Sequence, residues 1–337
     1  MRVALGVVLV VSGFTKSACL RAPLARVHPR VFRHLGSACR GMQAPKAAAE
    51  SLPTYDVHPM SDFDSLQRAG RDVCTIHMIR HAEGTHNVAR AYRDPSNLDA
   101  RLTARGEEQC NALAASCSAK QEMLDGIELV VTSPLTRCVQ TALLSLPMLA
   151  SGQRVTFLAH EGVRETVNYV CDQRRLISQI SAEFPRVDFS LMSHDHDDLW
   201  QRYEARLGTP AEYDGHRESA ELCAVAERGR GFLTWLNSQP QRTVVVSSHS
   251  AFLRCFFSFG QSRGVPSMPA QTLDRREGHE ARDVPVVRYC GDDSAFEGMM
   301  RADYSNCELR SFLVVFQKDG PCSNDMEGQD CRKDDRV

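Results

Sequence analysis

Residues 73–87 read Val-Cys-Thr-Ile-His-Met-Ile-Arg-His-Ala-Glu-Gly-Thr-His-Asn, and an apolar run changes into a polar loop within them. Val, Ile and Met dominate the first seven residues, a composition typical of a buried strand. The run ends in Arg80 and His81, whose side chains are cationic or can become so. Because like charges repel, this placement indicates that an anion lies between them. The stretch therefore predicts a strand that ends at an anion-binding site.

Further apolar runs predict a regular alternation of strands and helices. We expect strands at residues 127–133, 154–160, 242–250 and 309–317. Helical spacing of apolar residues lies between them, over residues 102–117, 135–146, 217–238 and 251–259. Ser133 before Pro134 is typical of a helix start, with serine as the N-cap and proline in the first helical position. This alternation predicts a three-layer α/β/α sandwich with a mostly parallel central sheet.

The ends of the chain differ in composition from its middle. No Asp or Glu precedes Glu50, and an apolar run at 3–14, too short to span a membrane, is followed by an Arg-rich tract. This two-part pattern favours a plastid presequence, with a mitochondrial transit peptide or secretion as alternatives. We assign residues 1–60 to a targeting or disordered segment, 61–318 to the folded domain and 319–337 to a disordered tail. Within the domain we expect a cap-like segment at 166–215 and a surface insertion at 261–306.

Charge and cysteine content narrow the classes of partner and cofactor. The chain has 40 basic and 42 acidic residues, which argues against nucleic acid or a membrane surface as partner, and we expect no stable membrane insertion after processing. Its 13 cysteines include no CxxC pair. This pattern predicts mostly buried, reduced thiols rather than a zinc site or a disulfide framework. The sequence leaves the oligomeric state open.

Polar side chains follow three of the expected strands. Arg80 and His81 end the first, Arg137 lies in the first turn after the second, and His249 and Ser250 end a later one. The carboxyl ends of parallel strands meet at one edge of an open sheet, where helix starts supply further N–H donors. Because the arginine fork matches phosphate oxygens, these groups predict a phosphate site.

Two histidines at a phosphate site also indicate catalysis. A neutral imidazole is a nucleophile, and positive neighbours lower its pKa and keep it unprotonated. A second, charged histidine can stabilise developing negative charge. A carboxylic acid must then protonate the leaving oxygen. Glu165, which follows the strand at 154–160, is the first candidate, and Glu161 and Glu83 are the alternatives.

The motifs around these residues resemble those of the histidine phosphatase superfamily, also called phosphoglycerate-mutase-like. Residues 80–83 match its Arg-His-Gly-Glu signature, and Asn87 matches its downstream asparagine. Residues 102–106 match a Leu-Thr-x-x-Gly helix start, and 132–142 match Thr-Ser-Pro-Leu-x-Arg-x-x-Gln-Thr-Ala. The acid motif matches at 163–165 and the second histidine motif at 246–250. The resemblance covers residues 73–317, and segments 169–189 and 306–312 are similar to a plant and fungal subgroup.

This resemblance implies a phosphoglycerate-mutase-like fold and a metal-independent, acid-type phosphatase that needs no cofactor and acts on a small phosphorylated substrate. It implies that His81 is the phosphorylated nucleophile and Glu165 the proton donor. It also implies that the phosphate group is bound by His249, Arg80, Arg137, Asn87 and Ser250. Ala82 replaces the usual glycine, so the backbone there must adopt a conformation that an L-residue tolerates.

The sequence allows two interpretations for several side chains. Glu83, Arg174 and Arg175 are possible substrate contacts, and the alternative for the two arginines is an exposed helix start. The stretch Ser-His-Asp-His-Asp-Asp at 193–198 fits a solvated loop better than a metal site, and we expect no metal. Surface ion pairs are expected for Glu218 and Arg228, and structural roles for His86 and His160. Phosphoglycerate mutase and a non-catalytic phosphate-binding module are the alternative functions.

Overall fold

A computed structural model describes residues 52–218, 222–261, 284–291 and 293–316. The expected presequence up to residue 51, residues 262–283 of the expected insertion and the expected tail at 319–337 lie outside the described residues. None of the helices in the described ranges is long and apolar enough to cross a membrane.

An eight-stranded sheet with the order β5-β4-β3-β6-β2-β8-β1-β7 forms the centre of the described chain. Only β8 runs antiparallel to its neighbours β2 and β1, and the other described pairs are parallel. The expected mostly parallel sheet is therefore confirmed. The strands are β1 (Tyr55–His58), β2 (Asp72–Arg80), β3 (Leu129–Thr132), β4 (Thr156–Ala159), β5 (Val187–Asp188), β6 (Thr243–Ser248), β7 (Val287–Tyr289) and β8 (Leu309–Phe316).

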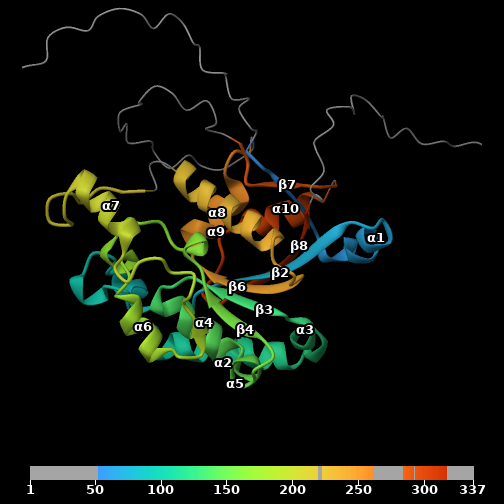
Figure 1. Cartoon of the computed structure of the whole chain (residues 1–337), viewed down its shortest axis with the longest axis horizontal. Helices are drawn as coiled ribbons and strands as arrows, with labels where there is room; N and C mark the ends of the chain where they lie inside the picture. The colour runs from blue at the N-terminus through green and yellow to red at the C-terminus, as the bar shows by residue number, and fades with distance from the viewer. Residues whose placement is uncertain (1–51, 219–221, 262–283, 292, 317–337) are drawn as a thin grey trace, which may run out of the picture. The chain divides into compact units, whose positions relative to one another are not determined.

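Helices cover both faces of this sheet (Figure 1). One face carries α8 (Leu222–Asn237), α9 (Ser250–Ser258) and α10 (Ser294–Arg301). The other carries α2 (Ala104–Ser118), α3 (Gln121–Gly126), α4 (Thr136–Ser145) and α5 (Pro147–Ser151). The remaining helices are α1 (Phe63–Arg68), α6 (Ile177–Glu183) and α7 (Asp198–Leu207). Together these layers form the expected α/β/α sandwich.

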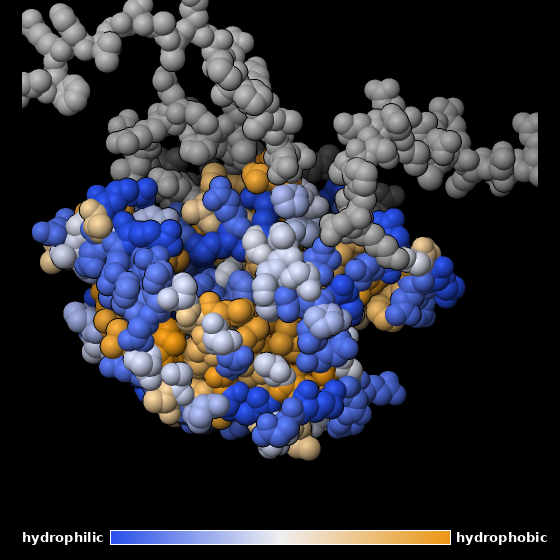
Figure 2. All heavy atoms as spheres, viewed as in Figure 1, coloured by the Kyte–Doolittle hydropathy of each residue, from blue (hydrophilic) through white to orange (hydrophobic). Residues whose placement is uncertain are grey.

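The apolar runs of the central strands explain why both faces are covered. In β6, Val244 and Val246 belong to the core beneath α8 and α9, whereas Val245 belongs to the core beneath α4. Successive side chains of a strand point to opposite faces, so an uninterrupted apolar run requires a helix layer on each side. Figure 2 shows mostly hydrophilic residues on the face in view, with hydrophobic ones gathered around β3 and β4.

The folded part begins before residue 61, which corrects the expected boundary. β1 pairs with β8 on one side and β7 on the other, and Val57 in its middle is fully buried. A four-residue strand offers too few positions to show an alternating pattern, so composition alone assigned it to the presequence.

Residues 284–306 also differ from the surface insertion that the sequence predicts. β7 extends the sheet beside β1, and α10 packs against the same core. Val287, Phe296, Met300 and Tyr304 are buried there. The Gly-, Pro- and charge-rich composition belongs mainly to residues 262–283, and it conceals the short buried segments that follow.

The predicted N-cap at Ser133 is wrong by two residues. α4 begins at Thr136 with Leu135 at the N-cap, and Leu135 offers no side-chain acceptor. Asp99 takes this role from elsewhere in the chain, because its Oδ1 accepts the Thr136 N–H at 2.8 Å and its Oδ2 accepts the Thr136 hydroxyl at 2.6 Å. The Ser133 hydroxyl accepts the Leu135 N–H at 3.4 Å and makes a shorter contact described below.

Two truncated chains test the corrected boundary. A chain that begins at residue 52 keeps β1, and one that begins at residue 61 loses it. We expect the shorter chain to unfold at a clearly lower urea concentration, because it loses a buried strand and its ladder to β7 and β8. Far-UV circular dichroism during urea titration measures both midpoints. Equal midpoints would show that β1 is not part of the cooperative fold.

Candidate active site

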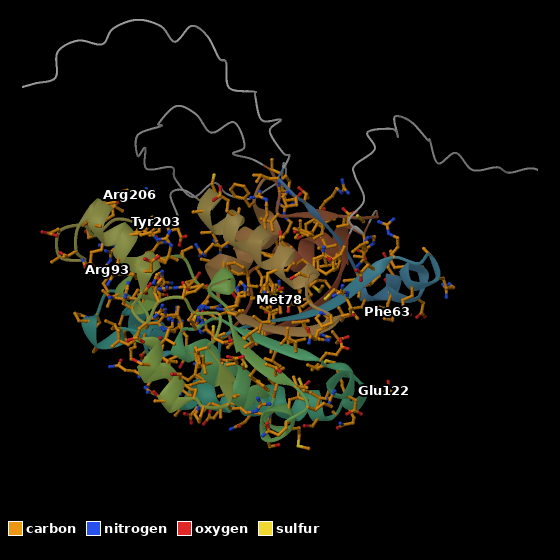
Figure 3. The ribbon with its side chains drawn as sticks, in the orientation of Figure 1. Phe63, Met78, Arg93, Glu122, Tyr203 and Arg206 are labelled. Atoms are coloured by element: carbon orange, nitrogen blue, oxygen red, sulfur yellow. The ribbon has the colours of Figure 1, made fainter. Side chains whose placement is uncertain are left out.

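The carboxyl ends of three neighbouring strands bring the predicted residues together. Arg80 at the end of β2 is in register with Ser248 of β6, and Thr132 of β3 with Ser247. The residues that directly follow these strand ends are His81, Ser133 and His249, and they therefore lie at the same edge of the sheet. In Figure 3, Arg93 and the α7 residues Tyr203 and Arg206 lie toward this end of the sheet, and Phe63 and Glu122 lie toward the other.

His81 is held in one tautomer by the backbone. Its Nδ1 lies 2.7 Å from the carbonyl oxygen of Ala82. A carbonyl can only accept, so Nδ1 carries the proton and Nε2 keeps its lone pair. The side chain is 1 % exposed, and burial, followed by the charge of Arg137, lowers its pKa well below the usual value. His81 is therefore a neutral imidazole that carries its lone pair on Nε2.

His249 lies beside His81, with 5.1 Å between the ring centroids. Its Nε2 is 2.8 Å from the Ser133 hydroxyl and 3.2 Å from the Cys138 sulfur. Burial, then Arg137, lowers its pKa well below the usual value. This environment favours a neutral ring, in contrast to the charged second histidine that the sequence suggests.

Two arginines of the site leave buried donors unused. Arg137 donates from Nη1 to the Cys171 carbonyl at 2.6 Å and from Nη2 to Asp172 Oδ1 at 3.1 Å. Arg80 donates from Nη1 to the Tyr304 carbonyl at 2.6 Å. The buried Nε of each has no partner within the described part of the chain. The Nε atoms of Arg164, Arg228 and Arg230 are buried and unpaired in the described chain as well, so it is the closeness of Arg80 and Arg137 to His81 that makes an anion the expected partner of these two.

Glu165 is the acid that the structure places at this site. Its Oε1 accepts the N–H groups of Thr166 and of Phe252 in the first turn of α9, both at 3.0 Å. Burial, and next the negative charge of Asp172, raises its pKa to about 7. A carboxyl with this pKa can give up and regain a proton near neutral pH.

The two alternative acids have other partners. Glu161 pairs with Arg164 and Arg174, and its side chain is about one-third exposed. Glu83 accepts the Thr103 hydroxyl at 2.9 Å, at the start of α2. Both carboxylates therefore hold the scaffold, and the structure favours Glu165 over them.

Three motif residues shape the backbone around the site. Asn87 accepts the Gly84 N–H at 2.9 Å and so closes its own turn. Ala82 does not have a positive φ, which confirms that this position tolerates an L-residue. A Cβ at Gly106 would lie 2.2 Å from the Glu83 carbonyl oxygen, so the close approach of α2 to this loop requires glycine. Ser250 is the first residue of α9, directly after His249.

The two arginines proposed as substrate contacts are bound to the protein itself. Arg175 pairs with Asp99 and Glu183. Arg174 is 5 % exposed, and all five of its N–H donors are used, by Glu161 and by the carbonyls of Arg175, His194, Asp195 and His196. These contacts give both side chains a structural role and leave Arg174 no donor for a substrate.

The acidic and histidine-rich loop at 193–198 is part of this scaffold. Asp197 accepts from Arg164 and caps α7 at the Trp200 N–H, and Asp195 accepts the Ser178 N–H. Among the described residues, no group of three or more His, Cys, Asp or Glu side chains is arranged to hold a metal ion.

His86 joins the site, although the sequence suggests a structural role. Its ring centroid is 5.4 Å from that of His81, and the side chain is 4 % exposed. Burial, and then Arg137 and Arg80, lowers its pKa to about 2. Asp172 is a second addition, since it pairs with Arg137 and is buried. His86 shares a loop with His81, which was a usable signal, whereas Asp172 lies in the segment 169–189, whose resemblance to a subgroup pointed to no single residue.

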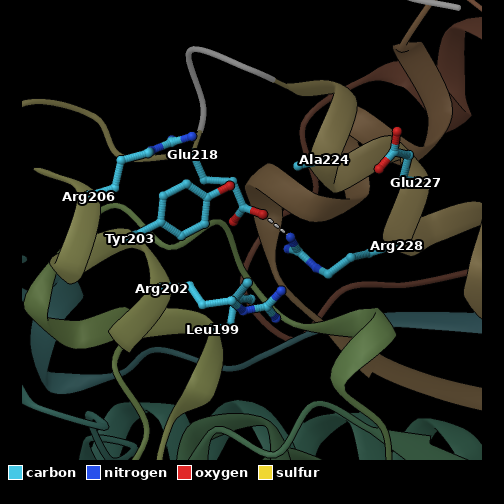
Figure 4. Close-up of a pocket in the computed structure, with 8 residues that line it drawn as sticks. All are labelled: Leu199, Arg202, Tyr203, Arg206, Glu218, Ala224, Glu227 and Arg228. Atoms are coloured by element: carbon cyan, nitrogen blue, oxygen red, sulfur yellow. Dashed lines mark hydrogen bonds and ion pairs between the residues drawn. The ribbon is translucent and has the colours of Figure 1, made fainter. Parts of the chain in front are cut away.

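A pocket of about 460 Å³ lies between α7 and α8 (Figure 4). Across it, Arg228 pairs with Glu218, and Arg228 also donates to the backbone carbonyls of Arg164 and Glu165 at 3.2 Å. Glu218 Oε2 accepts the Val167 N–H at 2.7 Å. The pair is therefore buried support for the Glu165 loop rather than a surface ion pair. The pocket is lined by Leu199, Arg202, Tyr203, Arg206, Glu218, Ala224, Glu227 and Arg228.

Comparison with known proteins agrees with this geometry. A profile of the histidine phosphatase superfamily (branch 1) matches residues 76–274. A phosphoglycerate mutase-like protein of Arabidopsis thaliana is 31 % identical over 272 residues, which cover 72 % of this chain and 84 % of that one. Phosphoglycerate mutase-like protein 1 of the same plant is 29 % identical, with coverage of 72 % and 81 %. The chain therefore belongs to the histidine phosphatase superfamily.

A solved structure is also similar in part. Mycobacterial glucosyl-3-phosphoglycerate phosphatase in complex with VO3 is 24 % identical and covers 54 % of this chain and 79 % of its own, with a TM-score of 0.32. Membership of the superfamily identifies this chain as an enzyme of the phosphatase or mutase type.

Replacing Arg137 by lysine tests the anion site. Lysine keeps the charge beside Asp172 but removes the unpaired Nε–H, so we expect the Kd for inorganic phosphate to rise about 10- to 100-fold. Isothermal titration calorimetry measures this value. Arg186→Lys is the matched control, because Arg186 is likewise bound to backbone carbonyls, near α5 and the start of β4. Equal phosphate affinity in both variants would contradict the site.

Proposed function

We propose that this chain hydrolyses phosphomonoesters through a phosphohistidine intermediate on His81. The observation that carries the proposal is a neutral His81, with its lone pair on Nε2, close to Arg80 and Arg137, each of which has a buried donor that is unpaired among the described residues. A neutral imidazole there is a ready nucleophile, and the arginines neutralise the charge of the group it attacks.

The first step transfers the phosphoryl group to the protein. Nε2 of His81 attacks phosphorus, the ester P–O bond breaks, and the leaving oxygen takes the proton of Glu165. Arg80, Arg137 and His249 hold the phosphoryl oxygens during this exchange. The raised pKa of Glu165, about 7, supports this role, because the carboxyl still holds its proton in mildly acidic solution.

The second step returns the protein to its starting state. The Glu165 carboxylate takes a proton from water, the water oxygen attacks phosphorus, and the P–N bond breaks. Inorganic phosphate leaves, and His81 recovers its lone pair on Nε2. His81, Glu165 and one water molecule account for every proton transfer and bond change, so the proposal needs no metal or cofactor.

The main alternative is a mutase, which returns the phosphoryl group to a second hydroxyl of the substrate. The relatives carry phosphoglycerate mutase-like names. A mutase needs basic groups that face the substrate carboxylate, but Arg174, Arg175 and Arg186 bind protein carboxylates and carbonyls instead. These three arginines are therefore bound within the protein, and the proposal takes hydrolysis of a small phosphorylated substrate before the mutase reaction.

A substrate panel tests the proposed reaction. Wild type, His81→Ala and His160→Ala are assayed for phosphate release from p-nitrophenyl phosphate, sugar phosphates, phosphoglycerates and nucleotides, with EDTA present. We expect release by wild type and by His160→Ala, whose ring lies tilted against Trp235, with 4.6 Å between the centroids, and outside the motifs. We expect a loss of at least about 10³-fold in His81→Ala.

Two results would contradict hydrolysis at His81. Equal activity in wild type and His81→Ala would show that another group is the nucleophile. Interconversion of 2- and 3-phosphoglycerate that depends on a bisphosphoglycerate primer, with little release of phosphate, would establish the mutase alternative.

Glu165→Gln tests the acid through the leaving group. An alkyl phosphate needs a proton on its leaving oxygen, whereas p-nitrophenolate leaves without one. We expect the variant to lose about 10²- to 10⁴-fold in kcat/KM on an alkyl phosphate and much less on p-nitrophenyl phosphate. In wild type, kcat/KM on the alkyl phosphate should fall as the pH rises through about 7, because the carboxyl then loses its proton. Equal losses on both esters would assign the proton transfer elsewhere.

A further inference from the structure

Cys110 and Cys307 meet directly behind the strand end that carries His81. They are 197 positions apart in the sequence, and their sulfur atoms are 4.0 Å apart. Cys110 lies in the middle of α2, and Cys307 lies two residues before β8. Both are buried in one small cluster with Ala82 and Leu102. The fold therefore presents a pair of free thiols in contact.

Backbone contacts couple Cys307 to the nucleophile. The Cys307 N–H lies 3.1 Å from the Arg80 carbonyl oxygen and 3.3 Å from that of His81. The neighbouring Asn306 side chain donates to the His81 carbonyl at 3.0 Å. Cys307 also has a φ of 59°, a left-handed conformation that is unusual for a residue other than glycine. A shift of Cys307 would therefore move the carbonyl groups of Arg80 and His81, which lie directly before and after the Cα atom of His81.

We propose that Cys110 and Cys307 form an oxidative modification site, which a small hydroperoxide closes to a disulfide and which thereby displaces His81. Sulfur atoms in a disulfide are about 2.05 Å apart, so the bond draws them together by about 2 Å. Ala82 lies in the same cluster, and its carbonyl fixes Nδ1 of His81. A displacement of this size at a reacting group is enough to slow catalysis.

The chemistry starts at Cys110. Cys307 donates its S–H toward the Cys110 sulfur, and this hydrogen bond lowers the pKa of Cys110. The Cys110 thiolate attacks one oxygen of hydrogen peroxide, the O–O bond breaks, and the released hydroxide takes up a proton to become water. The Cys307 sulfur then attacks the sulfenic acid, the S–O bond breaks, and the departing hydroxide takes the Cys307 proton. Two thiols and one peroxide give one disulfide and two waters.

Burial sets the kind of oxidant and separates this pair from the other thiols. Cys110 is fully buried and Cys307 is 7 % exposed, so a bulky disulfide cannot approach the pair, and the proposal needs an oxidant as small as hydrogen peroxide. Cys138, which contacts His249, has its pKa raised to about 12 by burial and stays protonated.

The test treats the full chain with hydrogen peroxide, blocks remaining thiols with N-ethylmaleimide and maps peptides without reduction. Wild type, Cys110→Ser, Cys307→Ser and the control Cys117→Ser are compared, the last on the same helix as Cys110. We expect a Cys110–Cys307 linked peptide in wild type and Cys117→Ser. We expect their kcat/KM to fall roughly 10- to 100-fold and to return with dithiothreitol. Cys110→Ser and Cys307→Ser cannot form the disulfide, so both should keep their activity under peroxide.

The activity readout rests on the proposed hydrolysis, whereas the peptide map does not. Absence of the linked peptide in wild type overturns the site, whatever the enzyme hydrolyses. A linked peptide with unchanged activity overturns the coupling to His81, and so does equal inactivation in Cys110→Ser. If no ester is hydrolysed even after reduction, the proposed function fails. The coupling is then measured by comparing the Kd for phosphate of the oxidised chain with that of the reduced chain. Circular dichroism identifies any serine variant that does not fold, and the other then carries the test.

Discussion

The hydrogen bond from Nδ1 of His81 to the carbonyl of Ala82 is the contact on which the rest of the site depends. It fixes the tautomer and directs the lone pair of Nε2 away from the backbone. The backbone can make this bond because β2 is held in register between β6 and β8 up to Arg80. The eight-stranded sheet thus holds the imidazole of His81 in a fixed position.

Burial explains most of the electrostatics around this ring. Arg137 is almost completely enclosed, and Asp172 is the carboxylate that faces it. Burial, and next the positive charge of Arg137, lowers the pKa of His81, His86 and His249, whereas burial, and next the charge of Asp172, raises the pKa of Glu165. The Nε donors of Arg80 and Arg137 have no partner among the described residues and are available to an anion, although Asp172 already pairs with Nη2 of Arg137. Anion binding by the arginines, the nucleophilicity of His81 and the acid strength of Glu165 therefore have one common cause, which is the burial of charged groups away from water.

The sequence could predict the parts of the fold and site that rest on long patterns. The apolar runs of β2, β3 and β6 and the motifs at 80–83, 132–142 and 246–250 placed His81, Arg137 and His249 at one sheet edge. Short elements such as β1 and β7 were missed, because three or four residues show no usable period. The helix cap was misplaced, since Asp99 reaches it from a distant part of the chain, and Asp172 and the pair Cys110 and Cys307 likewise depend on tertiary contacts. Side chains such as Arg174 were ambiguous, because sequence does not show which partners use their donors.

Locating the phosphoryl group during turnover tests the account most directly. Enzyme quenched in alkali during hydrolysis of a phosphomonoester is digested, and the phosphopeptide is sequenced by mass spectrometry, while ³¹P–¹⁵N nuclear magnetic resonance identifies the nitrogen that carries phosphorus. The account predicts a phosphorylated peptide that contains His81, with phosphorus on Nε2. Phosphorus on Nδ1 of His81, or on any other residue, would contradict it.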